Sequence, residues 1–286
     1  MQVRVNSFLL VTITSLFLLV GCSERNSTEP TPTVQLEANG DVAESVAGAV
    51  GEQSGGVIDQ VGDIFELTSS IQLDKATGDG FLDHREATYD DVTGTWTVIL
   101  QRERGQVGET PYGYWDRIYT VQFKDTNGQP QKFYITEGDT ARSILFEIIE
   151  GSGYFKNNHK SHALKEIGGS FVATDTHKDM ITVNGTYHRA AVDTLTTRNF
   201  RRTSDHVLDL TVTDLVGPRG SRRNLSQKVS GVITGTFHAD IVFEGERGYA
   251  EKSVDRSIHI VLGGGEADIE VEGNKCPSDV LTGQVK

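Results

Sequence analysis

One stretch of alternating residues constrains the fold of this chain more than any other feature. Over residues 229–243 every second residue is apolar or glycine, and most of the residues between them are polar: Val-Ser-Gly-Val-Ile-Thr-Gly-Thr-Phe-His-Ala-Asp-Ile-Val-Phe. Successive side chains of a strand point to opposite faces, so this period of two predicts one long strand with a buried face and a solvated face. We therefore expect the strand to belong to a larger antiparallel sheet.

A short segment of this stretch occurs three times along the chain. A β-branched residue, a polar residue, Gly, Thr and an aromatic residue follow one another at 92–96, 183–187 and 233–237. A second strand-like run begins 23 or 24 residues after each of the glycines Gly94, Gly185 and Gly235. We interpret the three units as an internal repeat of a long β-hairpin. The unbroken alternation through Gly235 favours a strand over a tight turn at this glycine.

The remaining segments fit around these hairpins. Residues 41–72 carry apolar residues at helical spacing that glycines interrupt near Gly56, which predicts one or two short amphipathic helices. Residues 92–275 are expected to form the antiparallel β domain, and 276–286 a flexible tail. The predicted fold is mainly β: a large antiparallel meander of long repeated hairpins, with the helices packed on the apolar face. A two-layer β-sandwich is the alternative.

The N-terminal residues look like an export signal. A short start with the single basic residue Arg4 precedes an apolar run from Phe8 to Val20, and the run is too short to span a bilayer. It ends in Leu-Val-Gly-Cys at 19–22, which resembles the lipobox of bacterial lipoproteins. The resemblance implies that residues 1–21 are removed, that Cys22 is acylated, and that residues 22–40 form a disordered tether. Ser23 after the cysteine resembles the pattern for passage to the outer membrane.

Charge and cysteine content restrict the partners of the chain. The formal net charge is −13. Nucleic acids and anionic membrane surfaces favour basic proteins, so we expect neither as the main partner. The expected membrane partner is the bilayer that holds the lipid on Cys22. Because acylation would occupy the sulfur of Cys22, Cys276 would remain alone, and no internal disulfide is expected.

An acidic, glycine-rich loop is expected at residues 73–91. Its segment Thr-Gly-Asp-Gly-Phe-Leu-Asp at 77–83, followed by Glu86, resembles the calcium loop of EF-hand proteins. The resemblance places Asp79, Asp83 and Glu86 at calcium-ligand positions, with calcium as the one possible cofactor. It puts Lys75 where an acidic residue should open the loop, and no sister loop is present. The alternative is an acidic turn that leads into the first strand.

Histidines are the other candidate ligands. His188 and His238 occupy the same position in the second and third repeats, on the polar face, and could form a metal site if the repeats were adjacent. A zinc site needs three or four converging ligands, and the sequence suggests no third. The alternative is two solvated histidines on the sheet surface.

The sequence contains no recognisable catalytic motif. It has no Gly-x-Ser-x-Gly elbow and no cysteine–histidine motif, and no feature selects a carboxylate pair for glycoside hydrolysis. We therefore expect a lipid-anchored, non-catalytic binding or structural module of the cell envelope, at the outer membrane rather than the inner one. The alternatives are a carrier that holds an apolar ligand or lipid in a curved-sheet cavity, and an envelope hydrolase without a recognisable motif.

Overall fold

The structure is a computed structural model that describes residues 38–69, 82–222, 224–246 and 248–286. Two helices come first and strands follow to the C-terminus. The elements are α1 (Ala38–Val50), α2 (Val57–Leu67), β1 (Leu82–Asp90), β2 (Thr95–Arg104), β3 (Tyr112–Lys124), β4 (Pro130–Gln131), β5 (Ile135–Thr136), β6 (Asp139–Thr140), β7 (Ser143–Lys156), β8 (Lys160–Thr174), β9 (Met180–Thr196), β10 (Phe200–Pro218), the 3₁₀ turn η1 (Leu225–Gln227), β11 (Ser230–Gly245), β12 (Gly248–Gly263), β13 (Glu266–Val271), β14 (Asn274–Asp279) and β15 (Gln284–Val285).

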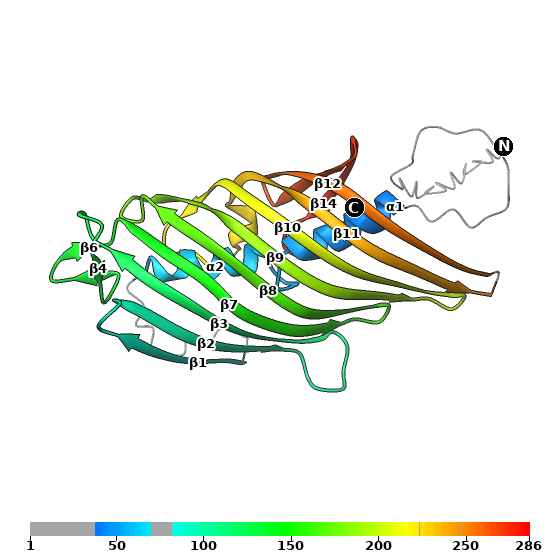
Figure 1. Cartoon of the computed structure of the whole chain (residues 1–286), viewed down its shortest axis with the longest axis horizontal. Helices are drawn as coiled ribbons and strands as arrows, with labels where there is room; N and C mark the ends of the chain where they lie inside the picture. Colours follow the sequence, from blue (N-terminus) through cyan, green and yellow to red (C-terminus); the bar gives the residue numbers. More distant parts are fainter. Residues whose placement is uncertain (1–37, 70–81, 223, 247) are drawn as a thin grey trace, which may run out of the picture.

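The strands form one large antiparallel meander (Figure 1). Thirteen strands make a single sheet in the order β1-β2-β3-β7-β8-β9-β10-β11-β12-β13-β14-β15, with β4 added beside β3. The short strands β5 and β6 pair with each other. This topology confirms the predicted fold class and excludes the two-layer sandwich as its description, because the long strands share one continuous sheet.

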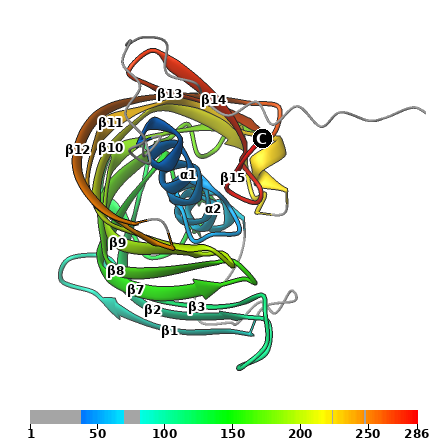
Figure 2. The same ribbon diagram turned by 90° about the vertical axis from the view of Figure 1, so that its right-hand side faces the viewer.

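The sheet curls around the two helices (Figure 2). Both helices lie against its concave face, where the apolar side of each strand forms the core together with helix residues such as Val46, Ile58 and Phe65, all 0% exposed. The helices therefore supply the cover that an open, curved sheet needs for its apolar face.

Strand β11 shows how the alternating pattern sets the register. Ile233, Phe237, Ala239 and Ile241 point into the core, whereas the residues between them lie on the outer face. Gly235 lies within the strand, as predicted. A Cβ on Gly235 would come within 2.0 Å of the backbone oxygen of Asp209 on β10, so this position has no room for a side chain.

Each of the three repeated segments contributes to the first strand of a hairpin, but the segments are not equivalent. The hairpins are β2–β3, β9–β10 and β11–β12. Gly185 and Gly235 lie inside strands, whereas Gly94 lies in the turn before β2 with a φ of 67°. Gly94 therefore differs from the other two glycines, because its left-handed backbone favours glycine.

The helices break where glycines cluster. Helix α1 ends at Val50, and α2 begins at Val57 after the connection through Gly51 and Gly56. A Cβ on Gly56 would lie 2.4 Å from the carbonyl oxygen of Ala49, so the chain turns back tightly at this point. The turn is fastened to the C-terminal segment, because the backbone N–H groups of Glu52 and Gln53 donate to the carbonyls of Val280 and Leu281 at 2.8 and 2.9 Å.

The acidic side of α2 is buried as well as its apolar side. Asp59 and Asp63 are 4% and 1% exposed. Both form ion pairs with Arg102, Arg117 and Arg222. The nitrogen–oxygen distances from Arg102 are 3.0 Å to Asp59 and 3.2 Å to Asp63. The arginines hold the pKa of both carboxyls below the usual range although burial opposes the charged form. Helix α2 thus sits inside the sheet with no solvated face.

Two sequence-based boundaries need correction. The acidic loop expected over 73–91 is shorter, because residues 82–90 form β1 and pair along their whole length with β2. The flexible tail expected over 276–286 instead continues the sheet as β14 and β15, and Cys276 and Val280 are buried. Cys276 is disulfide-bonded and not free, which differs from the expectation of a lone thiol. Within the described part of the chain, no helix has the length and apolarity to cross a membrane.

Candidate functional site

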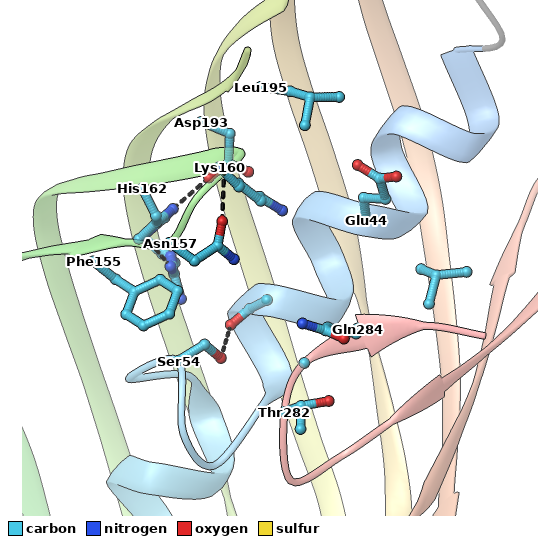
Figure 3. Close-up of a pocket in the computed structure, with 14 residues that line it drawn as sticks. Glu44, Ser54, Phe155, Asn157, Lys160, His162, Asp193, Leu195, Thr282 and Gln284 are labelled. Atoms are coloured by element: carbon cyan, nitrogen blue, oxygen red, sulfur yellow. Dashed lines mark hydrogen bonds and ion pairs between the residues drawn. The ribbon is translucent and has the colours of Figure 1, made fainter. Parts of the chain in front are cut away.

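A pocket of about 270 Å³ opens between the helices, the ends of three strands and the C-terminal segment (Figure 3). Helix α1 and the turn after it supply Glu44, Gly48 and Ser54, and the C-terminal segment supplies residues 282–285. The strands and the β7–β8 turn complete the wall with Phe155, Asn157, Lys160, His162, Arg189, Asp193 and Leu195. The pocket thus joins apolar walls to a concentrated group of polar side chains.

A buried hydrogen-bond chain forms one side of the pocket. His162 on β8 contacts Asp193 on β9, with 2.5 Å between Nδ1 and Oδ1. Ser45 of α1 donates to the other carboxylate oxygen of Asp193 at 2.7 Å. Arg189 approaches the remaining ring nitrogen of His162 through its Nη2. All four side chains are at most 8% exposed, so the chain ties α1 to the sheet in a site of low polarity.

The charge states follow from burial and from these neighbours. Burial and the adjacent Arg189 lower the pKa of His162 from its ordinary 6.5 to about 4. Burial opposes the charge of Asp193, but Lys160 and the hydrogen bond from His162 hold its pKa well below the usual range. His162 is therefore neutral at neutral pH. Its Nδ1–H donates to Asp193, and its Nε2 accepts from Arg189.

This arrangement does not fit nucleophilic catalysis. In a Ser–His–Asp triad the serine hydroxyl bonds to the histidine, which removes its proton. Here Ser45 bonds to the carboxylate, and the nitrogen of His162 that could act as a base accepts from Arg189. These contacts fix the positions of the charged side chains Asp193 and Arg189, and they leave no base to remove a proton from Ser45.

The charged side chains of the pocket wall balance one another, because Glu44 and Asp193 are acidic and Lys160 and Arg189 are basic. Glu44 is paired at 2.9 Å with Arg202, which also pairs with Asp41. Asp193 is hydrogen-bonded to Ser45 and His162. Within the described residues neither Lys160 nor Arg189 forms an ion pair with a carboxylate, and Nε and Nη1 of Arg189 have no hydrogen-bond partner. Lys160 and Arg189 are therefore the two cations of the wall without an ion pair of their own.

The predicted calcium ligands are only partly described. Asp79 lies outside the described residues, as does Cys22, the predicted lipidation site. Asp83 and Glu86 belong to strand β1 and not to a loop. The exposed carboxylate of Glu86 contacts Nε2 of His84 at 3.1 Å. The calcium site stays a prediction, although two of its ligands would have to come from a paired strand.

The two predicted metal histidines lie on separate strands of the outer face. His188 on β9 contacts Asp209 of β10 at 2.7 Å, and His238 on β11 contacts Asp255 of β12 at the same distance. Strand β10 lies between the strands that carry them. Across β10, His238 is aligned with Ala190, which is two residues further along β9 than His188. The hydrogen bond and charge of Asp255 raise the pKa of His238. No group of three metal-binding side chains occurs among the described residues.

Sequence analysis missed the buried chain of contacts, although a signal for it was present. Along β9 the inward positions read Tyr187, Arg189, Ala191 and Asp193, so two charged residues interrupt an otherwise buried face. His162 lies in β8 and faces inward. Charged residues at the alternate positions of a strand that are otherwise buried could have suggested an internal polar site.

The comparisons with known proteins provide no relative. A scan against family models finds no match, and searches of curated proteins and of solved structures find no similar protein. The interpretation of the pocket therefore rests on its geometry and charge.

Proposed function

We propose that this protein is a lipid-anchored, non-catalytic binding module of the bacterial cell envelope, held at the outer membrane through Cys22. The observation that supports the binding role is the pocket beside α1, which is lined by a buried polar chain and by Nε and Nη1 of Arg189, atoms without a hydrogen-bond partner among the described residues. The lipobox-like residues 19–22 support the anchor. The tether expected over residues 22–40 is shortened by α1, which begins at Ala38, and the rest would let the folded part stand off the bilayer.

The filled interior argues against the alternative of a lipid carrier. Core residues of both helices occupy the concave face, where a carrier would need an apolar cavity for acyl chains. The pocket beside α1 is small and largely polar at one side, so it suits a compact ligand better than a diacyl lipid. A hydrolase finds no support in the contacts of Ser45 and His162.

Anchoring at Cys22 has a consequence for Cys276. The chain contains two cysteines, and a thioether to lipid uses the sulfur that a disulfide to Cys276 would need. The two states are mutually exclusive and differ in mass.

A variant that fills the pocket tests the binding role. Gly48 lies on α1 in the pocket wall, and a Cβ placed there meets nothing within 4 Å, so Gly48→Phe has room to block the pocket. Gly40→Phe, on the same helix and also in open space but outside the pocket, is the matched control. We expect full-length wild type and Gly40→Phe to retain a small molecule through purification that Gly48→Phe lacks, as measured by mass spectrometry of solvent extracts. Identical extracts would contradict a binding role, and diacyl lipid other than the anchor would favour the carrier.

A further inference from the structure

We propose that the pocket binds a small organic monoanion, a carboxylate with a short apolar body, whose negative group lies at Lys160 above the buried Arg189. This inference rests on the proposed binding function and adds the chemical class of the ligand. It is argued from charge, from hydrogen-bond donors and from the shape of the pocket.

Two cations of the wall favour a negative group at one side of the pocket. Arg189 is 1% exposed and has no ion pair with a carboxylate among the described residues, and solvent screens the charge of such a buried group little. Lys160 is half-buried at the wall, and Figure 3 shows its side chain extending towards α1. An anion at Lys160 would give this lysine the ion pair that it lacks. Glu44 and Asp193 line the same space and would repel a second negative charge on the ligand.

Neutral donors surround the position of this anion. The side-chain oxygen of Asn157 accepts the backbone N–H groups of His159 and Lys160 at 3.0 and 2.7 Å, which leaves its NH₂ group as a donor. Gln284 brings a second amide from the C-terminal segment, and Figure 3 shows it across the pocket from Asn157. Amide and ammonium donors together match the acceptors of a carboxylate.

The remaining walls fit a short apolar body. Phe155, Leu195 and Val285 line the pocket away from the polar chain. The pocket volume of about 270 Å³ lies below the roughly 300–1,000 Å³ of pockets for drug-sized ligands. A short carboxylate such as hexanoate is therefore a suitable probe, and a long acyl chain is not.

Calorimetric titration of the full-length protein with hexanoate, hexanol and hexylamine tests the inference. Lys160→Met removes the proposed contact, and Lys165→Met is its control, since Lys165 lies on the same strand but pairs with Asp205 on the outer face at 2.8 Å. We expect hexanoate to bind at least about tenfold more tightly than the alcohol or the amine. We expect Lys160→Met to weaken hexanoate at least about tenfold and Gly48→Phe to abolish binding. Lys165→Met and Gly40→Phe should bind as wild type does.

The outcomes separate the inference from the proposed function. If the three compounds bind equally and Gly48→Phe blocks them all, the pocket binds ligands but the anion preference is wrong. Hexanoate binding that survives Gly48→Phe or Lys160→Met would overturn the site. If nothing binds and the extracts of wild type and Gly48→Phe are also identical, both the inference and the proposed function fail.

Discussion

Burial and the neighbouring Arg189 control the protonation of His162. It lies between Arg189 and Asp193 and within 6.4 Å, ring centroid to centroid, of His206, whose pKa is also lowered by burial. Each of these groups is buried, so adding a proton to His162 would place a second cation beside Arg189 without solvent to screen it. The site therefore requires a neutral histidine.

The free energy of unfolding should decrease as the pH falls from about 6.5 to about 4. In this range the unfolded chain binds a proton at His162 and the folded protein does not. The unfolded histidine titrates near 6.5 and the folded one near 4, so the unfolded state binds more protons between these values. The full contribution is present above about pH 6.5 and is lost progressively towards pH 4. Between about pH 7.5 and pH 5, His162 alone should cost about 2 kcal/mol of unfolding free energy.

Urea unfolding of His162→Gln at the two pH values measures this contribution. The variant should lose about 2 kcal/mol less than wild type over the same interval. His84→Gln, which replaces an exposed histidine on β1, should behave as wild type does. Equal pH dependence in wild type and His162→Gln would show that His162 is not held neutral by the fold.

Single residues of the site were the hardest part to predict from sequence. Arg189 and Asp193 follow the same alternation as their apolar neighbours, so their inward direction could be inferred. Their contact with Ser45 could not, because it joins residues 148 positions apart through the placement of α1 in the sheet. Pairing His188 with His238 failed for a related reason, since strand β10 lies between the strands that carry them.

At the scale of elements, helix α2 is fixed to the sheet by charge as much as by apolar packing. Asp63 lies within 3.2 Å of both Arg102 and Arg117, and it also contacts Arg222. Removing one partner from a buried ion-pair cluster leaves the other charges uncompensated, which costs more than the pair itself contributes.

Asp63→Asn should therefore destabilise the fold strongly. We expect a loss of about 3–5 kcal/mol in the free energy of unfolding, measured by urea denaturation followed by circular dichroism. Asp205→Asn removes an exposed carboxylate that pairs with Lys165, and it should change stability by less than about 1 kcal/mol. A similar small effect for both variants would mean that the arginines of the sheet do not hold α2 in place.

Elements were predictable where the local pattern decides the structure. The alternation of residues 229–243 gave β11, and glycine spacing gave the break between α1 and α2. The depth of α2 was not predictable, because Asp59 and Asp63 are typical of a solvated helix face until the arginines opposite them are known. Strand β1 was missed because its charged and polar residues suit an edge strand and also suit a loop.

At the scale of the whole molecule, the sheet is open and its interior is filled. Its path runs from edge strand β1 to edge strand β15, and the two helices occupy the concave face. The helices, the ends of β8 and β9 and the C-terminal segment meet at the pocket. The segment expected to carry the lipid therefore leads directly into the helix that forms one wall of the proposed ligand site.

The mass of the mature N-terminus tests the envelope assignment most directly. The full-length protein, expressed in a bacterium and extracted with detergent, is digested without reduction, and the peptide that contains Cys22 is analysed by mass spectrometry. We predict that this peptide begins at Cys22 and carries a diacylglyceryl group. A Cys22 peptide without lipid, or one joined by a disulfide to the peptide that contains Cys276, would contradict a lipid-anchored protein.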